Sequence, residues 1–202
     1  MSHPPEKLVR RLVMVAEELQ EVFAERGHHI DQALEVDEAF GSPQTIAFLM
    51  RDLAIDAVAA AASRVGVEFG PVNGSGRELL SFDEGIERRF RLRRASRGAD
   101  GGAILMTANS DAPLRVTADE GDGLFPIEAW TFGWIPASGS ALVAEAFVAP
   151  LLRFEPGTPG HLILGSVIPL LGPETPSGAF RPTDEGLEGF DDDELGGEAD
   201  SV

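Results

Sequence analysis

The chain contains no cysteine. This excludes disulfide bonds, a catalytic thiolate, and thiolate ligands for zinc or iron–sulfur clusters. The first residues also lack the apolar stretch of a secretory leader, since Glu17, Glu18 and Glu21 interrupt the first hydrophobic segment. Both absences fit a reducing compartment and predict a cytoplasmic protein.

Long hydrophobic runs are missing as well. The most apolar stretches are residues 53–62, which contain Asp56, and residues 162–171, which contain Gly165 and Pro169. Each is about half of the roughly 20 residues that a helix needs to cross a bilayer. We therefore expect no contact with a membrane.

Basic residues are scarce: the chain has 16 Lys and Arg against 34 Asp and Glu, a net charge of −18. Residues 182–202 hold nine acids and no base, which leaves 25 acids against 16 bases in residues 1–181. Both parts repel phosphate, so the charge argues against a nucleic-acid partner and favours a basic protein partner.

Helical patterns occupy the first third of the chain. In residues 5–26, Leu8, Leu12, Val15, Leu19 and Val22 are spaced 4, 3, 4 and 3 residues apart, which is typical of a helix packed along one face. That face is either part of the core or the seam of a weak homodimer. A second helical segment is expected at 28–40. A third follows the capping pair at residues 42 and 43 and ends at the glycine at 66.

The pattern then changes to strands. We expect a loop-rich region at 66–86 with a short strand at 67–69, then strands at 87–95, 103–108, 113–118, 126–135, 142–154 and 160–170. The short turns between them predict an antiparallel meander. The sequence thus predicts one α+β domain over residues 1–172, with helices (5–64) packed on a mostly antiparallel sheet of about five or six strands (87–170). Residues 173–202 are expected to form a disordered acidic tail.

The strongest local departure from the average composition is the arginine strand, which we define as residues 88–97. It holds six arginines, of which Arg89, Arg91 and Arg93 should share one face of a strand. They could pair with acids of the same chain, hold the acidic tail, or bind an anionic ligand. In the tail, Phe190 stands before Asp191, Asp192 and Asp193, which is either a solubilising segment or an apolar anchor for binding a partner. These seven residues are the predicted partner-binding set.

Candidates for a catalytic or metal site are weaker. His28, Asp31 and Glu35, with Glu38, would share one helix face and could hold a divalent metal, or could simply be solvated. A nuclease-like core has possible acids in Asp83, Glu87, Glu128 and Glu145. However, the lysine such a core needs is missing, because the only lysine is Lys7. We therefore expect no catalytic residue, no cofactor and no bound metal.

These observations favour a non-enzymatic regulatory or interaction protein, such as an inhibitor, an antitoxin-like protein or an adaptor, that binds a basic protein partner. Two alternatives stay open: a metal-dependent hydrolase or nuclease-like enzyme, and an acidic mimic of nucleic acid.

Overall fold

The computed structural model describes residues 3–37, 40–71, 76–99, 101–108, 111, 114 and 125–172. The predicted tail at 173–202 lies outside the described residues, as does the expected strand at 113–118 apart from Leu114. Within the described part, the chain is an α+β protein with three helices followed by strands: α1 (Glu6–Arg26), α2 (His28–Glu35) and α3 (Pro43–Val65).

Helix α1 confirms the periodic pattern. Leu8, Leu12, Val15 and Leu19 are buried in the main core, and the predicted Val22 is half-buried against it. Phe23 is buried in the same core. The apolar face of α1 therefore packs inside the chain, mainly against α3 and strands β8 (Val143–Glu155) and β10 (Ile168–Leu171).

Helix α3 begins and ends at the predicted residues. The Ser42 hydroxyl accepts a hydrogen bond from the backbone N–H of Thr45 at 3.1 Å, and Pro43 occupies the first turn. Gly66 ends the helix with φ 68°, a left-handed conformation that glycine adopts without steric cost. Small buried residues such as Ala54, Ala57 and Ala61 let α1 and α3 pack closely.

Ten strands follow the helices among the described residues. They are β1 (Glu68–Pro71), β2 (Arg77–Asp83), β3 (Ile86–Arg94), β4 (Ser96–Arg97), β5 (Ile104–Leu105), β6 (Thr107–Ala108), β7 (Ile127–Pro136), β8 (Val143–Glu155), β9 (Gly160–Leu164) and β10 (Ile168–Leu171).

The sheet corrects the predicted meander in two ways. Eight strands form it, in the order β1-β2-β3-β7-β8-β9-β6, with β10 also paired to β8. The central strands β3 and β7 are parallel neighbours, so the sheet is mixed. The remaining strands, β4 and β5, form a separate two-stranded sheet.

Three strand boundaries also differ from the prediction. Strand β2 lies in the region expected to be a loop. Both faces of this strand are partly buried, so its polar and apolar residues do not alternate clearly and the sequence pattern does not predict a strand. The expected strand at 103–108 is two short strands, β5 and β6, in different sheets. The expected strand at 160–170 is divided into β9 and β10.

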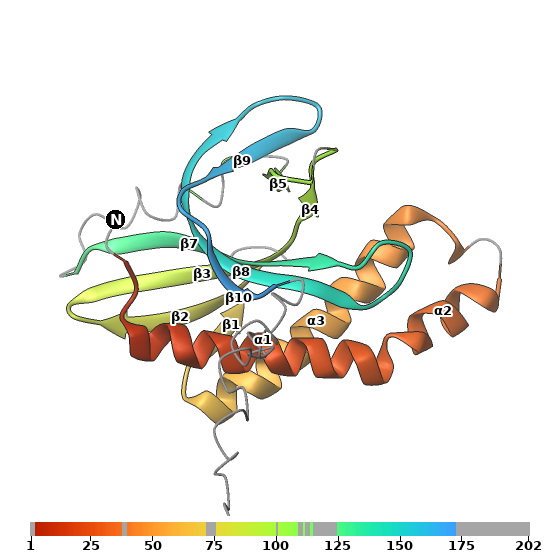
Figure 1. Cartoon of the computed structure of the whole chain (residues 1–202), viewed down its shortest axis with the longest axis horizontal. Coiled ribbons are helices and arrows are strands. Elements are labelled where there is room, and N and C mark those ends of the chain that lie inside the picture. The colour runs from red at the N-terminus through yellow and green to blue at the C-terminus, as the bar shows by residue number, and fades with distance from the viewer. Residues whose placement is uncertain are drawn as a thin grey trace, which may run out of the picture.

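The molecule is layered (Figure 1). Helices α1 and α3 cover one face of the sheet, and the outer parts of β8 and β9 lie on the side away from the helices. One buried cluster fills the space between the helices and the sheet, and a smaller one, with Met106, Phe147 and Leu162, lies on the opposite face. None of the described helices is both long and apolar enough to span a bilayer.

Candidate functional site

Strand β3 carries five of the six arginines of the arginine strand, and its register decides which of them lie opposite a carboxylate. Arg88 lies directly opposite Glu128 of β7, and its Nε donates to Glu128 Oε2 at 3.1 Å. The Arg88 side chain is fully buried, and Trp130 Nε1 donates to the same carboxylate oxygen at 3.1 Å. This is a buried, hydrogen-bonded ion pair, so Arg88 has a structural role.

Two further arginines pair on the opposite face of β3. Arg91 lies opposite Glu78 of β2, and its Nε donates to Glu78 Oε1 at 2.8 Å in a nearly buried pair. Arg89 Nε donates to Glu87 Oε1 at 2.6 Å within the same strand. These contacts agree with the interpretation that the arginines pair with acids of the same chain.

The last arginines of the arginine strand differ from one another. Arg97, in β4, pairs with Glu145, and these hydrogen bonds raise the pKa of Arg97. Arg93 lies opposite Gly133, and its Nε is buried without a hydrogen-bond partner in the part of the chain that the structure describes. Burial, followed by repulsion from Arg91, lowers the pKa of Arg93 to about 10. Its Nη1 donates to the Thr107 carbonyl at 3.3 Å.

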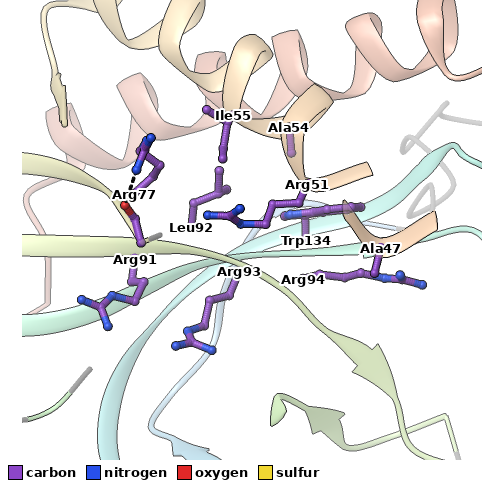
Figure 2. A pocket seen from close by; sticks show the side chains of 11 residues that line it. Ala47, Arg51, Ala54, Ile55, Arg77, Arg91, Leu92, Arg93, Arg94 and Trp134 are labelled. Atoms are coloured by element: carbon purple, nitrogen blue, oxygen red, sulfur yellow. Dashed lines mark hydrogen bonds between the residues drawn. The ribbon is translucent and has the colours of Figure 1, made fainter. Parts of the chain in front are cut away.

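A pocket of about 390 Å³ lies on the helix side of the sheet, where α3 crosses the ends of β2, β3 and β7. Figure 2 shows Arg51, Arg77, Leu92 and Trp134 on this side, with Arg91 and Arg93 pointing to the other side of β3. We call this cavity the arginine pocket. The full lining is Ala47, Arg51, Ala54, Ile55, Gly76, Arg77, Arg91, Leu92, Arg93, Arg94 and Trp134.

The charges of the arginine pocket are poorly balanced. Arg77 donates to the Gly76 carbonyl at 2.8 Å, and neither Arg77 nor Arg94 has a carboxylate partner among the described residues. Arg51 lies 4.0 Å from Asp52, its neighbour in sequence. The pocket can therefore attract an anionic group.

Sequence reasoning missed this pocket, because Arg51 belongs to a helix and Arg77 to a region expected to be a loop. The predicted partner-binding residues Arg89, Arg91 and Arg93 point away from the pocket or are paired, and their role in binding a partner stays a prediction. The other members of that set, Phe190, Asp191, Asp192 and Asp193, lie outside the described residues.

The acids considered for a nuclease-like core are held apart by their partners. Glu87 and Glu128 pair with different arginines on different faces of the sheet. Glu145 pairs with Arg97, and Asp83 accepts a hydrogen bond from Ser81. The structure therefore does not bring these four carboxylates together.

The metal candidates lie on α2, where His28, Asp31 and Glu35 are all exposed. Glu38 lies outside the described residues. Across the described ranges, no three His, Asp or Glu side chains are grouped closely enough to hold a metal ion.

Comparisons with known proteins return no match to this chain, whether among family models, curated proteins or solved structures.

Proposed function

We propose that this protein is a non-enzymatic interaction protein that binds a basic protein partner through its acidic surfaces. The observation that carries the proposal is a stripe on helix α1. Glu17, Glu21 and Glu25 recur every four residues, so they share one face of the helix, and all three are exposed. None of them has an arginine partner in the described part of the chain. We call these residues the acidic stripe.

The distribution of ion pairs explains why the surplus negative charge lies on the surface of the protein. Several arginines of the sheet form internal ion pairs, as Arg88 does with Glu128 and Arg91 with Glu78. The carboxylates left over face solvent, and the nine acids of residues 182–202 have the same sign. A surface of one sign accelerates association with a partner of opposite charge and repels nucleic acid. The proposed role is that of an inhibitor, an antitoxin-like protein or an adaptor.

The test compares two neutralised forms of the full chain. One carries Glu17→Gln, Glu21→Gln and Glu25→Gln, and the other carries Asp191→Asn, Asp192→Asn and Asp193→Asn. Gln and Glu have similar helix propensities, so the first form should keep α1 intact. Proteins captured from a lysate of the source cell by the wild type are identified by mass spectrometry and purified for titration.

We expect captured proteins of high isoelectric point whose dissociation constant rises about tenfold with either neutralised form. The control is Glu6→Gln with Glu155→Gln, which removes two acids that belong to exposed ion pairs with Arg10 and Arg153. This control should bind as the wild type does. An acidic partner, or one that binds both neutralised forms unchanged, would contradict the proposal.

A further inference from the structure

The arginine pocket combines an apolar floor with cationic walls. Leu92 and Trp134 come from adjacent strands and Ile55 from helix α3, and their side chains line the cavity. Trp134 is held in place by packing on Phe23, with ring centroids 5.2 Å apart. The volume of about 390 Å³ is within the range of pockets that bind ligands. The floor therefore accepts an apolar side chain.

The cationic walls are unusual for this chain. Arg77 and Arg94 have no carboxylate partner among the described residues, although acids outnumber bases two to one in the sequence. Guanidinium groups bind carboxylates through paired hydrogen bonds. A ligand that fits the pocket carries an apolar or aromatic side chain directly beside carboxylates.

The chain itself contains such a segment. Phe190 is followed by Asp191, Asp192 and Asp193 and preceded by Glu188. This segment has the aromatic group and the run of carboxylates that the pocket requires. It is the densest acidic run in the chain.

The sheet register places the start of the tail near the pocket. Arg94 is paired with Trp134, Trp134 with Ala146, and Ala146 with Leu171, the last residue of β10. Strands are about 4.8 Å apart, so these three steps span roughly 14 Å. The 18 residues between Leu171 and Phe190 can span up to roughly 60 Å at about 3.3 Å each, which is more than enough to reach the pocket. A tether of this kind gives an effective concentration of about a millimolar, so a weak contact is sufficient.

We infer that the arginine pocket binds residues 188–194 of the same chain, with Phe190 on the floor formed by Leu92 and Trp134 and the adjacent carboxylates on Arg77 and Arg94. The site goes beyond the proposed function, because it needs no second protein. In this arrangement a basic partner competes with the pocket for the same acids of the tail.

The test is a paramagnetic label in the tail of the full chain. Because the chain has no cysteine, Gly189→Cys places a nitroxide beside Phe190 at a single position. The label should broaden the amide NMR signals of residues 76–77 and 92–94 and leave those of Glu6 and Glu155 sharp. The broadening should fade between about 0.1 M and about 1 M salt, because salt screens exposed charges.

Two variants of the labelled chain decide the chemistry. Arg77→Gln with Arg94→Gln should abolish the broadening, whereas Arg10→Gln with Arg153→Gln, which removes the same charge from exposed pairs, should not. Phe190→Ser should also abolish it. Absence of broadening in the parent chain, or broadening that survives Arg77→Gln with Arg94→Gln, would overturn the inference.

A titration in trans separates the remaining occupants. A fluorescent peptide of residues 184–198 is added to a full chain carrying Phe190→Ser, Asp191→Asn, Asp192→Asn and Asp193→Asn. We expect binding that weakens about tenfold on Arg77→Gln with Arg94→Gln. If a peptide with Phe190→Ser binds equally well and inorganic phosphate displaces it, the pocket is a general anion site and the inference fails. It also fails if broadening in the labelled chain depends on protein concentration, because the occupant is then a second copy.

Discussion

The two halves of strand β3 use the same residue type in opposite ways. In the first half, Arg88 and Arg91 face Glu128 and Glu78 directly across the neighbouring strands. In the second half, Arg93 and Arg94 lie opposite Gly133 and Trp134 of β7, and neither of these residues carries a carboxylate. Arg88 and Arg91 therefore form ion pairs with acids on the neighbouring strands, whereas β7 offers no acid opposite Arg93 or Arg94.

Mutations in the first half of β3 should lower the free energy of unfolding more than mutations in the second half. Glu128→Leu leaves the buried Arg88 without its carboxylate, and removing one partner of a buried ion pair costs about 3–5 kcal/mol. We expect a loss of this size in the free energy of unfolding, measured by urea denaturation. The matched control is Arg88→Met combined with Glu128→Leu, because replacing both partners by apolar residues is often neutral. A single variant as stable as the wild type would show that Arg88 does not depend on this pair.

The second half has a packing reason for lacking an acid. A Cβ added at Gly133 would overlap the ring of Phe147, which is buried in the smaller core cluster. No side chain therefore fits opposite Arg93. We expect Gly133→Ala to lower the free energy of unfolding by about 1–3 kcal/mol, as overpacked cores do. Gly133→Ala combined with Phe147→Leu should recover part of the loss, and if it recovers nothing the contact with the ring is not the cause.

Arg93 should oppose folding slightly. Its pKa of about 10 lies below the usual value for arginine, mainly because burial penalises the charged form. Folding therefore carries a cost that is fully present well below pH 10, and Arg93→Met should raise the free energy of unfolding by about 1 kcal/mol at pH 7.

The pH dependence of this gain has a definite sign. Above pH 10 the unfolded chain holds the Arg93 proton more tightly than the folded chain does, so the stability of the wild type rises relative to the variant. The advantage of Arg93→Met should thus shrink between pH 9 and about pH 11. Unfolding of both proteins by guanidinium chloride at several pH values measures this difference in stability. A variant less stable than the wild type at pH 7 would show that the bond to Thr107 outweighs the burial cost.

The smallest effect is expected at Arg89, which belongs to the first half but is only half-buried. Its partner Glu87 is two residues away in the same strand and is also half-buried. Partly exposed pairs contribute about 0–1 kcal/mol, so Arg89→Ala should change the free energy of unfolding by no more than that. A loss above about 2 kcal/mol in thermal or urea unfolding would place Arg89 with the buried pairs instead.

The amino-acid sequence by itself determined the elements whose signals are local. The spacing of Leu8, Leu12, Val15 and Leu19 specifies α1, because residues three and four apart in a helix share a face. The boundaries of α3 follow from capping groups within a few residues of each end. Strands β3, β7 and β8 were placed to within one or two residues by their composition and length.

The tertiary structure alone decided which distant residues meet. The parallel pairing of β3 with β7 joins residues 40 positions apart, as in Arg88 and Glu128, and no periodicity encodes that register. The same holds for the arginine pocket, which combines Arg51, Arg77 and Arg94 from a helix and two strands. The physical reason is that helix periodicity and caps depend on neighbours along the chain, whereas charge pairing across a sheet depends on which strand packs beside which.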